Sequence, residues 1–248
     1  MFTTDERERV LRDLISLAKA APDVSAAAVT GSTATGDGDR WSDLDLALSV
    51  WGPLDGAIDR WTALLVADFG VLHHWDLRSG SVVYRVFLLS SGLEVDLGFY
   101  PEGDFGPRGP AWRPVFGTAD QPATAAKQDP GELIGLAWHH VLHARTSVER
   151  GQWWQAEHWI GATRTQVIAL AALRLGFPAS YAKGAHLLPA EVTASLTDTL
   201  VRHLDEVELR RALKAVVAAL ETELQNTDSR LAAELAPVLA DAVSADPT

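Results

Sequence analysis

A change of hydrophobic periodicity near the middle of the chain limits the folds open to it most strongly. Up to residue 100, short apolar or alternating runs typical of strands are interspersed with two helical patterns. After residue 130, apolar residues recur at the three- and four-residue spacing of long helices. Residues 101–130 are rich in Pro and Gly, and we expect a connection with little secondary structure there. The sequence therefore predicts an α+β fold, with a small mixed β-sheet domain (1–120) followed by an all-α helical bundle domain (121–248).

Individual elements follow from the same patterns. We expect strands over 25–30, 44–50, 71–77, 82–89 and 93–100, and a hairpin turn at 90–92. We expect helices over 5–20, 55–69, 132–149, 152–175, 191–204, 207–224 and 229–243. The polar segment 31–41 is expected to be a loop, or a loop with a short helix.

Composition excludes several classes of protein. The chain has no cysteine, which rules out disulfides, thiolate catalysis and cysteine-bound zinc. Its net charge is −12, with 10 basic and 18 acidic residues up to residue 120 and 11 and 15 after it. Because neither half is basic, we expect no nucleic-acid partner, whereas a cationic small molecule is compatible with this charge. With no signal-peptide pattern at the N-terminus and no apolar run of about 20 residues, we expect a cytoplasmic protein without membrane partners.

Two aspartates at the start of a predicted strand carry the main chemical signal. Asp43 and Asp45 are separated by Leu44, so strand alternation places both carboxylates on one face, about 7 Å apart along the chain. Carboxylates this close repel each other unless a cation lies between them. Magnesium prefers such oxygen ligands and commonly bridges carboxylates and substrate phosphates. The pair therefore predicts a magnesium site, with Leu44 and Leu46 facing the core.

Two further features extend this site. Gly31 and Ser32 follow a short apolar strand, where backbone N–H groups and a hydroxyl could bind phosphate oxygens. Asp96 lies between Val95 and Leu97, so it projects alone from one face of a later strand. If that strand lies beside the first pair, three carboxylates converge and could hold two metal ions.

Other catalytic motifs are incomplete. A P-loop starting at Gly31 would need Lys at position 37, where this chain has Asp37. No serine lies in a Gly-x-Ser-x-Gly elbow. His139 and His143 have the spacing of a zinc-binding helix, but position 140 is His140 rather than the required Glu, so packing or surface roles are expected.

The combination of Thr30-Gly31-Ser32, a polar spacer and Ser42-Asp43-Leu44-Asp45 resembles the nucleotidyltransferase superfamily that includes DNA polymerase beta and the antibiotic nucleotidyltransferases. Asp96 matches the third carboxylate of that pattern. The resemblance covers about residues 25–100. It implies Mg²⁺-dependent transfer of a nucleoside monophosphate, AMP from ATP in the first instance, to an acceptor. In this reading Asp43, Asp45 and Asp96 bind two Mg²⁺ ions and are catalytic, and Gly31 and Ser32 hold the nucleotide phosphates.

The second half looks like the helical domain of stand-alone aminoglycoside and lincosamide adenylyltransferases, through segments 143–176 and 181–189. A helical domain that closes on a triphosphate must supply positive charge, and we assign this nucleotide-binding role to Arg164 and Lys183. Arg85 and Glu157 are the candidates for acceptor binding. Their alternatives are a structural salt bridge for Arg85 and a solvated helix charge for Glu157.

Three hypotheses follow, in decreasing order of the support that the sequence gives them. The first is transfer of AMP to a hydroxyl of a small molecule, such as an aminoglycoside-like antibiotic, with release of pyrophosphate. The second keeps the fold but makes the acceptor a protein, as in antitoxin-type adenylyltransferases. The third is a nucleotide-binding regulator without turnover, and a polynucleotide polymerase is the least favoured variant because of the acidic charge.

Overall fold

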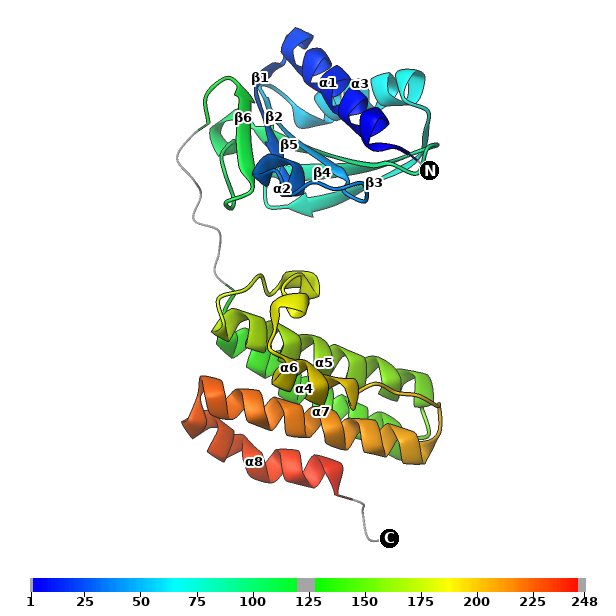
Figure 1. Cartoon of the computed structure of the whole chain (residues 1–248), viewed down its shortest axis with the longest axis vertical. Helices are drawn as coiled ribbons and strands as arrows, with labels where there is room; N and C mark the ends of the chain where they lie inside the picture. The colour runs from blue at the N-terminus through cyan, green and yellow to red at the C-terminus, as the bar shows by residue number, and fades with distance from the viewer. Residues whose placement is uncertain (1, 120–127, 245–248) are drawn as a thin grey trace. The chain divides into compact units, whose positions relative to one another are not determined.

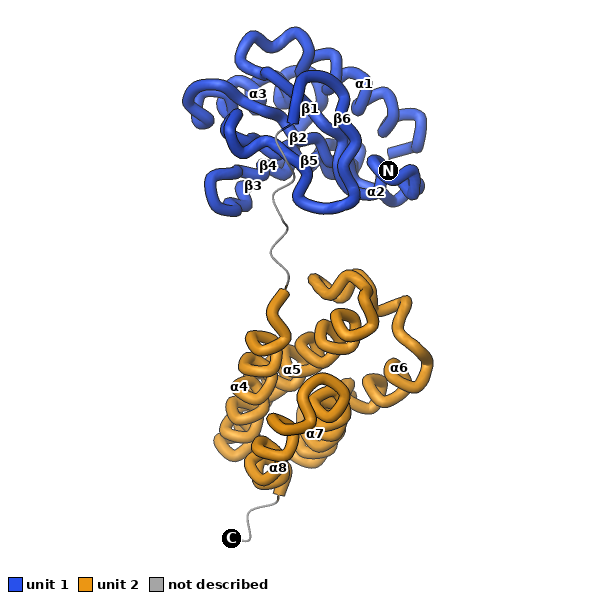
Figure 2. The backbone as a smooth tube through the Cα atoms, turned by 90° about the vertical axis from the view of Figure 1, so that its left-hand side faces the viewer, with its two compact units in different colours: residues 1–126 blue, residues 127–248 orange. Residues whose placement is uncertain are grey.

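The computed structural model describes residues 2–119 and 128–244 and confirms the predicted α+β fold (Figure 1). It divides into two compact units, residues 1–126 and 127–248 (Figure 2). The predicted domain boundary at residue 120 falls in the segment 120–127, outside the described residues. In the part of the chain that the structure describes, no helix is long and apolar enough to cross a lipid bilayer.

The first unit is a mixed sheet with helices. Its elements are α1 (Thr4–Ala20), β1 (Val24–Thr30), α2 (Gly31–Thr35), β2 (Leu44–Val50), α3 (Leu54–Asp68), β3 (Val71–Ser79), β4 (Val82–Leu89), β5 (Glu94–Pro101), η1 (Glu102–Asp104) and β6 (Trp112–Phe116). The strand order is β3-β4-β5-β2-β1-β6. β2 and β5 run parallel, and the other neighbouring strands are antiparallel. The predicted bounds of β2 and β4 are confirmed to the residue.

The prediction that residues 101–130 contain little secondary structure is wrong for β6. Trp112–Phe116 pairs with β1 and forms one edge of the sheet. Pro114, which lies opposite Ala28, has no N–H to give to a ladder, but an edge strand needs hydrogen bonds on only one side. The Pro and Gly residues around this short strand hide its pattern in the sequence.

The two faces of the sheet are chemically different. One face packs under α1 and α3 (Figure 1). Its buried strand residues are Val24, Ala27, Val29, Leu44, Leu46, Leu48, Val50, Val83, Phe87, Leu89, Val95, Leu97 and Phe99. The opposite face carries small and aromatic residues, among them Ala28, Ala47 and Tyr100. Because strand residues alternate, Asp45 and Asp96 lie on this second face, while the leucines beside them enter the core as predicted.

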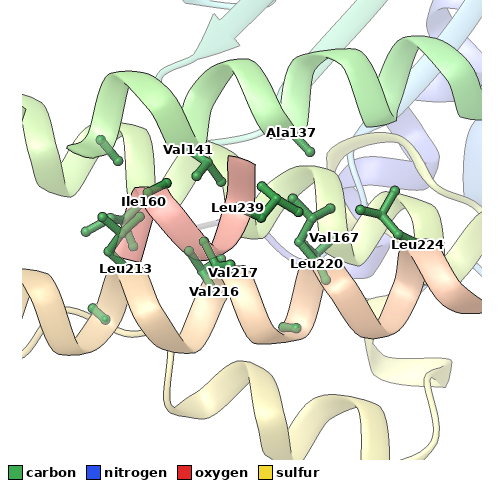
Figure 3. Packing of buried hydrophobic residues seen from close by; sticks show 14 of the residues in the cluster. Ala137, Val141, Ile160, Val167, Leu213, Val216, Val217, Leu220, Leu224 and Leu239 are labelled. Carbon is green, nitrogen blue, oxygen red and sulfur yellow. The ribbon is translucent and has the colours of Figure 1, made fainter. Parts of the chain in front are cut away.

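The second unit is helical. Its elements are α4 (Pro130–Glu149), α5 (Trp153–Arg174), η2 (Ser180–Ala182), η3 (Ala185–Leu187), α6 (Ala190–Thr197), α7 (Glu206–Thr227) and α8 (Ser229–Val243). Figure 3 shows the core of this bundle, where Val141, Ile160, Val217 and Leu239 bring α4, α5, α7 and α8 together.

Helix α6 ends seven residues before the predicted end at residue 204, because arginines bind the carbonyl groups that would continue it. The Arg211 guanidinium donates to the carbonyl oxygens of Asp198 (2.5 Å) and Leu200 (2.8 Å). The Arg164 guanidinium donates to that of Thr199 at 3.0 Å. These carbonyl groups are satisfied by side chains rather than by a further helical turn.

Candidate active site

Three carboxylates meet on the face of the sheet opposite the one that packs against α1 and α3. Asp45 lies directly opposite Asp96 in the parallel pairing of β2 and β5. Asp43 immediately precedes β2. One carboxylate oxygen from each residue lies within 4.8 Å of the other two, and all three residues are partly buried. The convergence predicted from the sequence is therefore present in the structure.

Asp96 is the electrostatically unusual member of this cluster. Burial raises its pKa to about 7, and the neighbouring charges of Asp45, Glu94 and Asp43 act in the same direction. Its Oδ1 atom is buried and has no hydrogen-bond partner among the residues that the structure describes. A buried, unpaired carboxylate oxygen is costly, and a proton or a cation would remove that cost. Three oxygen donors at this separation fit a Mg²⁺ ion, which prefers carboxylate ligands.

Gly31 lies against this cluster. It is the first residue of α2 and has a φ of +64°, a backbone conformation that favours glycine. A Cβ atom built on Gly31 would lie 2.1 Å from Oδ2 of Asp45, far inside van der Waals contact. Glycine is therefore needed here both for its conformation and for the space that it leaves beside the carboxylate.

Ser32 belongs to a hydrogen-bonded network that shapes the loop before Asp43. The Ser32 hydroxyl donates to the Ser42 hydroxyl at 3.1 Å. The Ser42 hydroxyl accepts from the backbone N–H of Asp39 at 2.9 Å and donates to the Asp39 carboxylate at 3.1 Å. A hydrogen bond from the backbone N–H of Trp41 lowers the pKa of Asp39, with a smaller contribution from Ser42. The network ties the start of α2 to the residue that precedes Asp43.

Arg7 anchors this loop and was not predicted as a site residue. It is 5% exposed, and its guanidinium donates to the Asp39 carbonyl oxygen. Arg7 shares the buried stripe of α1 with Val10, Leu14 and Ala18. A charge at the helical spacing of an apolar stripe was the available signal, since a buried arginine must find hydrogen-bond acceptors.

Arg85 lies away from the carboxylate cluster. It is paired with Leu97 across β4 and β5, on the face that α3 covers, whereas Asp96 is paired with Val86. Its guanidinium donates to both oxygens of Asp76, at 2.6 and 2.8 Å, and to the Thr62 hydroxyl of α3 at 2.7 Å. The hydrogen bonds from Arg85 to Asp76 lower the pKa of Asp76. Arg85 therefore forms a salt bridge with Asp76, which was the alternative to its predicted role in acceptor binding. It does not lie in the carboxylate cluster.

Glu157, Arg164 and Lys183 belong to the second unit. Glu157 and Arg164 line the same surface hollow of about 500 Å³ along α5. Lys183 is exposed and is not among the residues lining that hollow. The nucleotide-binding role of Arg164 and Lys183 and the acceptor-binding role of Glu157 stay predictions.

The chain matches no protein-family model and no curated protein sequence. Among solved structures it is similar to an aminoglycoside 6-adenyltransferase from Bacillus subtilis, with 10% identity, a TM-score of 0.43 and coverage of 99% of this chain and 100% of that one. It is also similar to Cid1 in complex with its short product ApU (15% identity, TM-score 0.30), covering 67% of this chain and 48% of Cid1. The third is the Bradyrhizobium diazoefficiens CD-NTase CdnG in complex with GTP (15% identity, TM-score 0.28), covering 92% and 72%.

Proposed function

We propose that this protein is a Mg²⁺-dependent nucleotidyltransferase that transfers AMP from ATP to a hydroxyl group of a small molecule. The observation that supports this proposal best is the convergence of Asp43, Asp45 and Asp96 within 4.8 Å, with a buried Asp96 oxygen that has no partner among the described residues. The sequence resemblance supplies the reaction class. The acidic balance of the chain, −12 overall, favours a small acceptor over a polynucleotide.

In this proposal the position of each carboxylate determines its role. Asp43 and Asp45, at the start of β2, would hold magnesium and through it the nucleotide phosphates, and Asp96 would complete the set from β5. Bound magnesium would neutralise the charge that develops on the phosphate oxygens. Gly31 and Ser32 would bind the β- and γ-phosphates through their backbone N–H groups, because the missing side chain of Gly31 lets the backbone lie against Asp45 and the Ser32–Ser42 hydrogen bond fixes the start of α2.

The reaction requires one bond to form and one to break at the α-phosphorus. The acceptor hydroxyl oxygen attacks the α-phosphorus while the bond from this phosphorus to the bridging oxygen of the β-phosphate breaks, and pyrophosphate leaves. The hydroxyl proton passes to the carboxylate of Asp96, whose Oδ1 has no hydrogen-bond partner among the described residues. Most of the rate enhancement would come from positioning and from charge neutralisation.

The proposal is tested by measuring pyrophosphate release from the four common NTPs against a panel of aminoglycosides and lincosamides. We expect release that requires both Mg²⁺ and one acceptor class, with ATP as the preferred donor, and a product heavier than the acceptor by one AMP in mass spectrometry. EDTA should abolish the signal. Release that needs no acceptor, or a complete lack of release with every pair, would contradict the proposal.

A further inference from the structure

An apolar surface continues from the carboxylate cluster toward one edge of the sheet. Strand register places four residues in one row across β2, β5, β4 and β3: Asp45 lies opposite Asp96, Asp96 opposite Val86, and Val86 opposite Trp75. Directly paired residues project from the same face of a sheet. Since neighbouring strands are about 4.8 Å apart, Trp75 lies about 10 Å from Asp96 along this row.

Several neighbouring positions of this face are apolar, although His73 and Glu94, which flank Leu88, are polar and exposed. Tyr84 of β4 is paired with Leu77 of β3, one alternation step from Val86 and Trp75. Leu88 lies one step from Val86 in the other direction, opposite Glu94. Trp75, Leu77 and Leu88 are 53%, 48% and 42% exposed. We call Trp75, Leu77, Val86 and Leu88 the apolar shelf.

The apolar shelf has the features of a binding surface. Single exposed apolar side chains are common, but several that adjoin one another often mark a binding site. The shelf also shares its face with Asp96, the carboxylate without a partner for Oδ1 among the described residues. A molecule bound to the shelf would therefore extend to the reacting groups.

The geometry of an in-line displacement indicates whether the apolar shelf lies on the side of ATP or on the side of the acceptor. The attacking oxygen and the leaving pyrophosphate must lie on opposite sides of the α-phosphorus. Gly31 and Ser32 follow β1, which borders β2 on the side away from β5. With the β- and γ-phosphates there, the acceptor must approach from the side of β5 and β4, where the shelf begins.

We propose that the apolar shelf binds the acceptor, and that this acceptor carries an apolar ring or alkyl group about 10 Å from the hydroxyl that is modified. This inference rests on the proposed function. It narrows the acceptor to an amphipathic compound, because the exposed aliphatic side chains of Leu77 and Leu88 offer a polar polycation neither charge nor hydrogen bonds. Trp75 is then a residue that determines specificity rather than a catalytic one.

The experiment compares Trp75→Ala with Trp51→Ala across the same acceptor panel. Trp51 is a matched control, because it is 63% exposed but follows the last residue of β2, at the opposite end of that strand from Asp45. A third variant, Trp75→Leu, keeps an apolar side chain. For the acceptor that the wild type uses, we expect Trp75→Ala to raise the KM about tenfold and to leave the KM for ATP and the melting temperature unchanged. Trp51→Ala and Trp75→Leu should stay within about twofold of the wild type.

The results distinguish a failure of this inference from a failure of the proposed function. Wild-type turnover of a purely polar acceptor with no change of its KM in Trp75→Ala would overturn the inference and leave the proposed function intact. A variant that changes the sedimentation coefficient, with no change in the acceptor KM, would instead show that the shelf is an interface between copies of the chain. A lack of pyrophosphate release with every NTP and acceptor would remove the proposed function and the inference together.

Discussion

Each unit of this protein holds an unusual carboxylate, and the two are stabilised in different ways. Glu223 of the second unit is 3% exposed, and the Arg174 guanidinium donates to both of its oxygens, at 2.9 and 2.8 Å. This pairing raises the pKa of Arg174. Asp96 of the first unit is partly buried, and its nearest charges are the carboxylates of Asp45, Glu94 and Asp43.

The difference separates a structural group from a functional one. A buried charge with a bidentate partner holds its surroundings in place. A buried carboxylate surrounded by like charges is unfavourable by itself, and such groups are concentrated at sites that bind cations or perform chemistry. We therefore expect substitutions at Glu223 to act on stability, and substitutions in the Asp43, Asp45 and Asp96 cluster to act on activity.

The largest expected effect is that of Asp45→Asn on turnover. The amide preserves the volume of the side chain but removes one negative charge from the proposed magnesium site. We expect pyrophosphate release to fall by about 1,000-fold or more, equivalent to about 4 kcal/mol of transition-state stabilisation. Asp37→Asn, at an exposed position of the loop that precedes Asp43, should keep wild-type activity. Wild-type rates in Asp45→Asn would contradict the assignment of the site.

Glu223→Ala tests whether the buried Glu223 carboxylate contributes to stability. The substitution removes a buried carboxylate that accepts two hydrogen bonds, and because the Arg174 side chain left behind is 26% exposed and can be hydrated, we expect a cost of about 1–2 kcal/mol. Urea denaturation should show this loss. The double variant Arg174→Leu/Glu223→Leu should recover much of it, because the unpaired charge is gone. A double variant as unstable as Glu223→Ala would mean that the ion pair contributes more than the desolvation that it offsets.

Gly31→Ala asks whether contact with the cluster matters beyond backbone conformation. Its Cβ would lie 2.1 Å from Asp45 Oδ2, so either the carboxylate or the start of α2 must move. A misplacement of about 1 Å can cost roughly 100-fold in rate, which is the effect expected on kcat. Gly36→Ala is the matched control, because Gly36 also has a positive φ, of 84°, but no atom within 4 Å of its Cβ position. Equal losses of activity in both variants would assign the effect to backbone strain.

Local pattern predicted much of the first unit, and the errors have physical causes. Strand β2 alternates between large apolar residues and polar or small ones, and β4 is an almost continuous apolar run between Ser and Gly turn residues, so their bounds follow from the sequence. Strand β6 does not, because Trp112–Phe116 contains Pro114 and gains its place only by pairing with β1, more than 80 residues earlier. The early end of α6 likewise depends on Arg164 and Arg211, which bind its carbonyl groups from other helices.

In the candidate site, too, local sequence patterns predict some features, whereas others depend on strand pairing. The sequence placed Asp45 and Asp96 each on one face of its strand, but their meeting depends on the parallel pairing of β2 with β5, which no local pattern specifies. Arg85 was assigned by its nearness in sequence to the site strand, whereas alternation along β4 turns it to the face covered by α3. The apolar shelf could not be foreseen, because Trp75 and Asp96 are on different strands and only the register aligns them.

The smallest expected effect is a pH dependence of stability that belongs to Asp96. In the folded protein the pKa of Asp96 is about 7, whereas an unperturbed aspartate titrates near 3.8. Between these two pH values the folded state holds a proton that the unfolded state has released. The contribution of this group to stability is therefore complete below about pH 4 and is lost as the pH rises through about 7.

In EDTA we expect the melting temperature of the wild type to fall by about 5 °C from pH 5 to pH 8 through this group. Asp96→Asn cannot ionise, so its melting temperature should fall less over the same range, while every other titrating group is shared by the two proteins. At pH 8, added Mg²⁺ should raise the melting temperature of the wild type, because a ligand that binds only the folded state stabilises it, and should raise that of Asp96→Asn less. Parallel pH curves for the two proteins would mean that the Asp96 carboxylate is relieved by its surroundings without a cation, and would place it with Glu223 among the structural carboxylates.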